Sequence, residues 1–463
     1  MAKNRELIRD LTTGSVPGTM LRFAMPLFLS GLLQMVYNMV DMIVVGQMVG
    51  TEGLSAVSVG GEMMMLITFI AMGFSNAGQI LISRYVGEKR HDLIGEMVAT
   101  LFTLLMSAAV VIMAIFLLTY RDILAWLNTP EDIWEFTCDY SITCILGTVF
   151  IYGYNLVSAI LRGMGDSKHP FMFIAIASVL NLALDVLFVG PMHMGPRGAA
   201  LATVIGQSVS FLFALTLLYR HREQIYFDFR PSHFRISKAV IRPLMSLGIP
   251  MVIQSAAITF SMLFVNSYIN QYGKVPIAVT GIARKLENMI SIVAQAISAA
   301  GGAMISQALG AKKISRVPKV VGHALWIVAI PSAIFAIITL IRPEWLFGIF
   351  SADPEVLAMV LEQYIPVAMI QYLGCTLRPP AFALINGSGK SKLNLAVALL
   401  DGIFTRIGLS LLLGVTFAWG IRGFWYGNAL SGLVPFLIGT AYLLSGRWKR
   451  MGAPKKAEAE ELD

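Results

Sequence analysis

Twelve apolar stretches follow one another along this chain, and each is long enough to cross a lipid bilayer. The hydrocarbon core of a bilayer is about 30 Å thick, which takes about 20 residues of α-helix. Inside hydrocarbon the backbone must satisfy its own hydrogen bonds, and a helix does so within one segment. The pattern therefore predicts an all-α integral membrane protein with twelve transmembrane helices. The expected spans are 20–45, 57–82, 94–119, 134–157, 170–190, 198–219, 243–269, 277–306, 319–341, 357–384, 393–416 and 422–445.

The composition and the charge pattern agree with insertion into a membrane. Of the 463 residues, 56% are apolar and only 13% are charged, whereas soluble proteins carry about 25% charged residues. If even-numbered helices return to the starting side, 26 of the 35 Lys and Arg residues lie on the side of the two termini and five lie opposite. The positive-inside rule then predicts a multi-pass protein of the cytoplasmic (inner) membrane with both termini in the cytoplasm. The net charge of +8 therefore marks orientation in the lipid bilayer and does not indicate a nucleic-acid partner.

The two halves of the chain resemble each other at a spacing of 223–225 residues. Residues 77–89 match 300–312 at six of thirteen positions, and 161–168 match 385–392 at four of eight. Because each half holds six spans, the two repeats have the same orientation, which is an architecture of transporters. We expect an N-terminal six-helix lobe, a cytoplasmic linker, a C-terminal six-helix lobe and a polar cytoplasmic tail. Their expected bounds are 1–220, 221–242, 243–446 and 447–463.

Proline occupies matching places in the two halves, with Pro26 in the first span opposite Pro250 in the seventh. Proline inside a helix removes a backbone hydrogen bond and bends the helix, and membrane proteins tolerate this around cavities. We therefore predict a helix bend at Pro26.

Two aspartates lie inside apolar spans of the first half. Asp at the centre of a membrane helix costs about 2.5–3.5 kcal/mol on insertion scales, so Asp41 and Asp185 are expected to face a cavity, a partner or an ion. Tyr37 and Gln34 precede Asp41 by four and seven residues, and Asn181 precedes Asp185 by four, so each set shares one helix face. In a carrier, such carboxylates bind a proton or a small cation. The alternative is a structural hydrogen bond between helices.

These features together resemble the multidrug and toxic compound extrusion (MATE) family, which belongs to the MOP superfamily. The resemblance rests on Pro26, Gln34, Tyr37, Asp41, Gly46 and Gly50 of the first span and on LRGMGDSKHP at 161–170, and it covers essentially the whole chain. An Asp in the first span together with Asn181 and Asp185 looks like the DinF-like branch. That resemblance implies two parallel six-helix repeats with a cation or proton site in the N-terminal half.

The family pattern also implies roles for individual residues. Asp41 and Asp185 are expected to bind the coupling ion, Na⁺ or H⁺, and no other cofactor is expected. Asn181, Thr203 and Asn155 would complete its shell, since hard cations take oxygen ligands. A bound Na⁺ would lie at Asp41, Asn181, Asp185 and Thr203. Tyr37 and Gln34 would respond to the ion and shape the substrate cavity.

The implied function is antiport, with export of small amphipathic, often cationic organic compounds in exchange for H⁺ or Na⁺ by a monomer. Two carriers of the same fold remain as alternatives: a flippase of lipid-linked saccharides, which would favour a cationic cavity, and a metabolite carrier. An enzyme is not expected, because no nucleophile, base and orienting group form a recognisable set. GSGKS at 387–391 lacks the first glycine of a phosphate-binding loop, and Cys138, Cys144 and Cys375 have no metal-ligand spacing.

The second half carries its charges differently. Other branches of the family place acidic coupling residues in the seventh and eighth spans, but the seventh span here has no acidic residue. Near the eighth, Arg284, Lys285 and Glu287 lie close enough in sequence to pair with one another. Asp401 and Arg406 in the eleventh span are expected to form an internal charge pair. The main coupling site is therefore expected in the first half.

Overall fold

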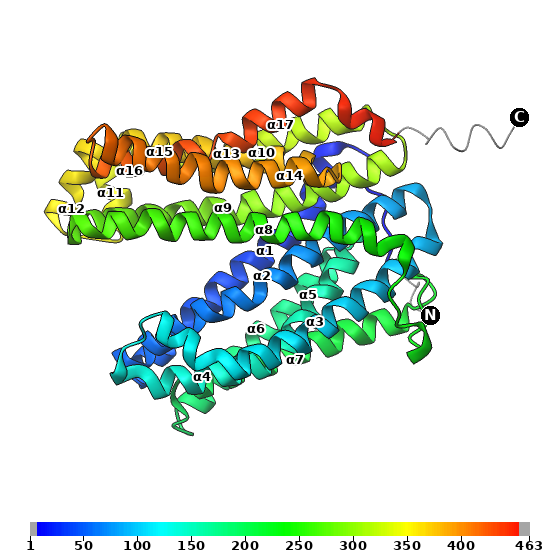
Figure 1. Ribbon diagram of the computed structural model, residues 1–463, viewed down its shortest axis with the longest axis horizontal. Coiled ribbons are helices and arrows are strands. Elements are labelled where there is room, and N and C mark those ends of the chain that lie inside the picture. Colours follow the sequence, from blue (N-terminus) through cyan, green and yellow to red (C-terminus); the bar gives the residue numbers. More distant parts are fainter. Residues whose placement is uncertain (1–6, 453–463) are drawn as a thin grey trace, which may run out of the picture. The chain divides into compact units, whose positions relative to one another are not determined.

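The computed structural model describes residues 7–452, and every regular element in that part of the chain is helical (Figure 1). Short 3₁₀ or π-helical turns link several neighbouring helices, such as the π-helical stretch Ala398–Ile407 between α14 and α15. The helices are α1 Val16–Met48, α2 Thr51–Glu88, α3 His91–Trp126, α4 Trp134–Leu146, α5 Thr148–Gly163, α6 Lys168–Val189, α7 Gly195–Arg220, α8 Lys238–Ile269, α9 Lys274–Gly310, α10 Arg316–Ile341, α11 Pro343–Gly348, α12 Pro354–Met359, α13 Ile365–Gly387, α14 Ser391–Val397, α15 Gly408–Leu411, α16 Ile421–Ser431 and α17 Val434–Leu444.

The predicted membrane spans are confirmed. Eleven helical segments of the described residues are long and apolar enough to cross a membrane, and α4 with α5 forms a twelfth when counted as one span. This fourth span is bent by 47° at its break. The break falls at Gly147, where a Cβ atom would lie 2.4 Å from the Val204 side chain. Glycine therefore lets α7 pack closely against the bend.

The helices form two compact units. Within the described residues, unit 1 comprises 7–9 and 25–248, and unit 2 comprises 10–24 and 249–452. These bounds differ from the expected lobes because α1 and α8 each divide between the units, the first near Pro26 and the second near Pro250. Both helices continue through their prolines without a break. The tail beyond residue 452 lies outside the described residues.

The two units share details that identify them as repeats. A Cβ atom at Gly163 would lie 3.0 Å from the Gln79 carbonyl oxygen and 2.8 Å from Ile82. At Gly387 the corresponding distances are 2.7 Å to the Gly302 carbonyl oxygen and 2.9 Å to Ile305. The glycine two residues later has a positive φ in both copies, 88° at Gly165 and 71° at Gly389. The weak sequence repeat therefore reflects the same close contact between helices in each unit.

Unit 1 holds its N-terminal residues against the loop between α5 and α6, which contains the LRGMGDSKHP sequence. The side chain of Asp166 is fully buried there. It accepts a hydrogen bond from the Lys168 N–H at 3.0 Å, contacts the His169 ring, and lies 3.9 Å from the Arg9 guanidinium. Burial alone would raise the pKa of Asp166, but the bonds from His169 and Lys168 and the charge of Arg9 outweigh it and lower this pKa.

The segment expected as a linker packs into unit 1. Ile225 and Phe227 are buried. The backbone of Tyr226 lies so close to α3 that a Cβ atom at Gly95 would lie 2.1 Å from its carbonyl oxygen. The Ser237 N–H donates to the Thr100 hydroxyl at 3.0 Å. These contacts fix the chain just before α8 begins.

Unit 2 has an aromatic core where α8, α9, α11, α12, α13 and α16 meet. Phe347, Tyr364, Phe424 and Trp425 are buried in it, and the rings of Tyr364 and Trp425 stack edge to face with centroids 5.0 Å apart. The Trp425 N–H donates to the Thr280 hydroxyl at 2.9 Å, so its polar atom is satisfied within the core.

Replacing Asp166 by Asn should lower the thermal stability of the protein. Hydrogen bonds to charged groups contribute about 1.5–3 kcal/mol, so we expect a loss of about 2 kcal/mol at neutral pH. Because the folded pKa of Asp166 is depressed, this stabilisation exists above the usual Asp pKa and is lost as the pH falls through the folded value. The difference in melting temperature between wild type and Asp166→Asn should therefore narrow as the pH falls below about 4. Unfolding in detergent, followed by tryptophan fluorescence, measures it.

The matched control is Asp132→Asn, at an exposed aspartate of the same unit. It should leave the melting temperature unchanged at every pH. A difference for Asp166→Asn that stays constant with pH would contradict a role for the ionised carboxylate.

Candidate functional site

The two predicted aspartates come together in unit 1. Asp41 lies on α1 and Asp185 on α6, and their carboxyl groups are close enough to interact electrostatically. Asp185 is fully buried and Asp41 is half-buried. Both oxygens of Asp185 and Oδ1 of Asp41 are buried without a hydrogen-bond partner among the described residues. A buried polar group without a partner is costly, so these oxygens are suited to a ligand.

A small polar cavity adjoins the aspartates between α1, α6 and α7. It has a volume of about 10 Å³, which is room for about one water molecule or one small cation. Tyr37, Ser178, Asn181, Thr203 and Gln207 contribute its polar lining. The Asn181 amide donates to the Thr203 hydroxyl at 3.4 Å, which leaves the buried Asn181 carbonyl oxygen without a partner. Tyr37, Asn181 and Thr203, which were predicted from the sequence, therefore line this cavity. Asp41 and Asp185 follow Tyr37 and Asn181 by one helical turn and do not line it themselves.

Gly206 explains how α6 and α7 come close enough to form this cavity. A Cβ atom at Gly206 would lie 3.2 Å from the Ala177 carbonyl oxygen and 3.5 Å from the Asn181 Cβ. Because glycine has no side chain, the two helices pack at this position and bring Asn181 opposite Thr203.

An apolar cluster lies one helical turn beyond the two aspartates. Val45 follows Asp41 by four residues, Val189 follows Asp185 by four, and both pack with Ala199 of α7. All three are buried, with at most 2% of their surface exposed. This cluster excludes water from the carboxylates on that side of the unit.

Tyrosines surround the carboxylates on other sides. Tyr37 interacts with Asp41, Asp185 and Tyr154, and Tyr140 of α4 lies near Asp41 and Tyr37. Tyr154 donates through its hydroxyl to the Pro170 carbonyl oxygen at 3.1 Å. Tyr140, Tyr154 and Gln207 are not among the residues predicted from the sequence. Gln207 follows Thr203 by four residues, and that spacing is a signal that places both on one face of α7.

Two residues of the predicted set have other surroundings. The Asn155 amide donates to the Ile151 carbonyl oxygen of its own helix at 2.8 Å. Gln34 is exposed on α1. Neither lines the small cavity.

Unit 2 also contains buried charges, but these are paired. Asp401 is fully buried and lies 3.2 Å from the Arg406 guanidinium and 3.4 Å from that of Arg378. The predicted Asp401–Arg406 pair is therefore confirmed. Glu287 accepts a hydrogen bond from the Gln371 amide and does not form an ion pair with Arg284 or Lys285. By contrast, no Lys, Arg or His of residues 7–452 forms an ion pair with Asp41 or Asp185.

The site therefore offers two carboxylates, an amide oxygen and hydroxyl groups, with no protein cation to balance the charge. Oxygen donors of this kind suit a proton or a hard cation such as Na⁺. Within the described residues no group of three or more His, Cys, Asp or Glu side chains has the arrangement of a metal site. The amide and hydroxyl oxygens would thus have to supply part of any cation's shell.

Comparison with known proteins connects this site to a family. A family model described as MatE matches residues 26–187 and again residues 250–413, and the two matches begin at Pro26 and Pro250. The "Probable multidrug resistance protein YpnP" of Bacillus subtilis (strain 168) is 27% identical over 443 residues, which cover 96% of this chain and 98% of YpnP.

Solved structures share the fold. One described as "Outward-facing conformation of a multidrug resistance MATE family transporter of the MOP superfamily" matches with a TM-score of 0.87 at 20% identity and covers 98% of this chain and 100% of that one. Another, described as "Crystal structure of MATE in the bent conformation", matches with a TM-score of 0.86 at 20% identity over 96% of this chain and 98% of its own. Because the family model matches most of the chain in two copies, the chain belongs to the MatE family, the multidrug and toxic compound extrusion transporters.

Proposed function

We propose that this protein is a secondary active antiporter that exports amphipathic, often cationic organic compounds in exchange for H⁺ or Na⁺. The coupling site is the pair Asp41 and Asp185 with Asn181 and Thr203. The similarity to YpnP, which is named a probable multidrug resistance protein, supports organic compounds as the substrates. The presence of Asp41, Asn181 and Asp185 in one unit supports the DinF-like branch.

The observation that carries this proposal is the difference in charge pairing between the units. Two adjacent buried carboxylates repel each other when both are ionised, and burial adds a desolvation cost. In unit 2 this cost is offset within the protein, because Arg378 and Arg406 flank Asp401. In unit 1 the described residues provide no such cation, so a proton or a metal cation from outside has to supply the positive charge.

Exchange follows if the ion and the organic cation bind to different conformations. Charge compensation by an ion would draw α1, which carries Asp41, toward α6 and α7. Next to Asp41 on α1, the side chains of Met39, Met42 and Ile43 are 45–51% exposed. A helix held by few buried contacts moves at low cost, so α1 is suited to change conformation when the ion binds. Tyr37, next to both carboxylates, would transmit this change to the substrate cavity.

Asp41→Asn and Asp185→Asn should each abolish export driven by an ion gradient. The substitution removes the titratable charge with little change in volume, so folding and membrane insertion should persist. Proteoliposomes loaded with a cationic dye, with a Na⁺ gradient and a pH gradient imposed separately, measure export. They also show which ion is coupled, because only the coupled gradient should drive transport in the wild type.

Asp139→Asn is the matched control for these variants, since Asp139 is an exposed aspartate of the same unit. It should export dye at the wild-type rate. If Asp41→Asn and Asp185→Asn also export at that rate, the assignment of the coupling site is wrong.

Binding of the ion and the drug should be reciprocally linked. Because coupling free energies are symmetric, an ion that weakens drug affinity must be displaced by drug to the same extent. We expect dye affinity to fall on protonation or Na⁺ binding in the wild type and to be insensitive to the ion in Asp41→Asn. Dye titration against pH and Na⁺ by fluorescence polarisation measures this.

Asp401→Asn should keep the ion dependence of dye affinity. Removing one partner of a buried ion pair destabilises a protein by about 3–5 kcal/mol, so its main effect should be a lower melting temperature. Loss of ion dependence in Asp401→Asn alone would move the coupling site to unit 2.

The proposed orientation places both termini and the segment 221–242 in the cytoplasm. Ser232 is exposed in this segment, and Asp132 is exposed in the loop between α3 and α4 on the opposite side. In a background without native cysteines, Asp132→Cys should react with a membrane-impermeant maleimide added to intact cells. Ser232→Cys should react only after the membrane is opened. Labelling of Ser232→Cys from outside would reverse the orientation.

A further inference from the structure

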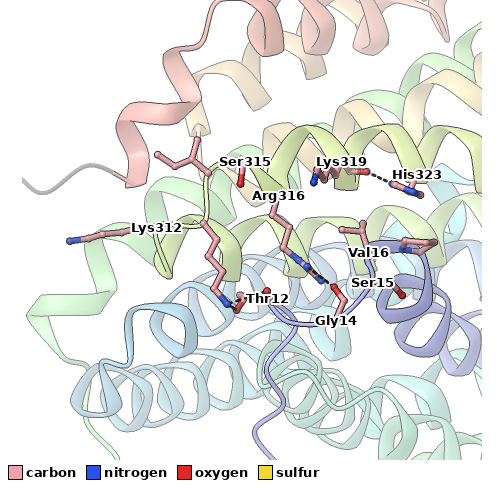
Figure 2. Close-up of a pocket in the computed structure, with 12 residues that line it drawn as sticks. Thr12, Gly14, Ser15, Val16, Lys312, Ser315, Arg316, Lys319 and His323 are labelled. Carbon is pink, nitrogen blue, oxygen red and sulfur yellow. Dashed lines mark hydrogen bonds between the residues drawn. The ribbon is translucent and has the colours of Figure 1, made fainter.

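Unit 2 contains a cavity outside the site described above. It lies between the residues that lead into α1, Thr12–Pro17, and the turn from α9 into α10, Lys312–His323 (Figure 2). Its volume is about 570 Å³, far larger than the small cavity beside Asn181. Both sides of the cavity belong to the same compact unit.

Basic residues dominate the walls of this cavity. Lys312, Lys313, Arg316 and Lys319 line it, and none of the lining residues is acidic. Asp10 lies close enough to Lys313 and Arg316 to interact with them electrostatically. Its carboxylate accepts a hydrogen bond from the Thr12 N–H at 2.7 Å. One carboxylate balances at most one of four cationic charges, so the cavity keeps a strong positive potential.

Lys313 and Arg316 form hydrogen bonds to the opposite wall of the cavity. The other basic residues remain available to bind a ligand. Lys313 donates to the Thr12 hydroxyl at 2.7 Å, and Arg316 donates to the Gly14 and Thr13 carbonyl oxygens at 2.9 Å each (Figure 2). These acceptors are neutral, so the charges are not cancelled. The Arg316 Nε atom is buried without a hydrogen-bond partner. Lys312 and Lys319 are exposed at the cavity and form no ion pair among the described residues.

The equivalent turn of unit 1 shares some of these basic residues but not all of them. Lys89 and Lys312 occupy equivalent positions, with φ values of 57° and 59° at the same turn. In this register, Lys319 corresponds to Glu96 of unit 1. There the Glu96 carboxylate accepts a hydrogen bond from the Ser237 hydroxyl. The units therefore differ at this turn, because Arg316 and Lys319 of unit 2 correspond to Leu93 and Glu96 of unit 1. Both turns lie on the side predicted to be cytoplasmic.

An apolar face leads away from the cavity along α10. The spacing of Lys319, His323, Trp326, Ile330, Ile334 and Ile337 places all six on one side of the helix. Trp326 is 73% exposed and Ile330 is 62% exposed. A ligand with an anionic head in the cavity could therefore extend an apolar chain along this face into the bilayer. A free inorganic anion would use only the first part of this surface.

We propose that this cavity binds the phosphate group of an anionic phospholipid, with the acyl chains lying along α10. Basic pockets at the cytoplasmic ends of transmembrane helices bind such headgroups, and each Lys near the surface contributes about 1 kcal/mol. The head would contact Lys319, Lys312 at the rim would add positive potential, and Lys313 and Arg316 hold residues 12–14 as the opposite wall. This site goes beyond the proposed transport function and does not depend on it.

Native mass spectrometry of the delipidated full chain in detergent tests the proposal. The probes are phosphatidylglycerol, zwitterionic phosphatidylcholine and inorganic phosphate. We expect one tightly bound phosphatidylglycerol, no comparable binding of phosphatidylcholine, and displacement of the lipid by phosphate only at large excess. Lys312→Gln with Lys319→Gln should weaken phosphatidylglycerol binding about thirtyfold, since each lysine contributes about fivefold.

The matched control is Lys89→Gln with Lys392→Gln, which removes two exposed lysines that are predicted to face the cytoplasm and do not line the cavity. It should bind phosphatidylglycerol as the wild type does, and all lipid-free proteins should unfold at one temperature. Equal loss in both double variants would overturn the proposal, because binding would then follow net charge. Equal affinity for phosphatidylcholine, or phosphate binding as strong as lipid binding, would overturn the assignment to an anionic lipid.

Discussion

The rest of this structure depends on the requirement that a backbone in hydrocarbon satisfies its own hydrogen bonds. This requirement leaves helices as the building blocks, and helices meet closely only where small residues allow it. The Val204 side chain packs against Gly147 at the bend between α4 and α5. The backbone of Ala177 packs against Gly206. The second contact sets Asn181 opposite Thr203, so the geometry of the candidate site follows from how closely α6 and α7 can pack.

A buried charge in such a fold needs an opposite charge beside it. The two units differ in whether the protein itself supplies that charge. Asp401 lies between two arginines, which makes that part of unit 2 self-sufficient. Asp41 and Asp185 lack a cation among the described residues and lie beside an apolar cluster. A structural charge pair is stable because the protein supplies both charges. A coupling site has to lack its positive charge until the ion binds. The unpaired aspartates meet the second condition.

The spans and the repeat could be predicted because hydrophobic length and helical spacing are local properties of the sequence. That Asp41 and Asp185 act together was implied by the family resemblance. Gln207 could also have been found, four residues after Thr203. Tyr140 and Tyr154 could not, because their position depends on the 47° bend between α4 and α5, which sets the rotation of each helix. Family resemblance alone suggested Asn155, and its amide bonds to its own helix. A sequence pattern does not show with which neighbouring group a polar side chain will form its hydrogen bond.

The division of the chain near Pro26 and Pro250 has a consequence for how the protein is made. Residues 10–24 are synthesised well before their partners in unit 2, which follow about 300 residues later. The Leu11 N–H bonds to Gln307 across 296 positions, and Thr12 bonds to Lys313 across 301. Contacts so distant in sequence slow folding, because the chain must close a long loop before they form. The start of α1 therefore has to remain without its final partners until α9 and the turn after it emerge, so this segment reaches its place long after it has left the ribosome.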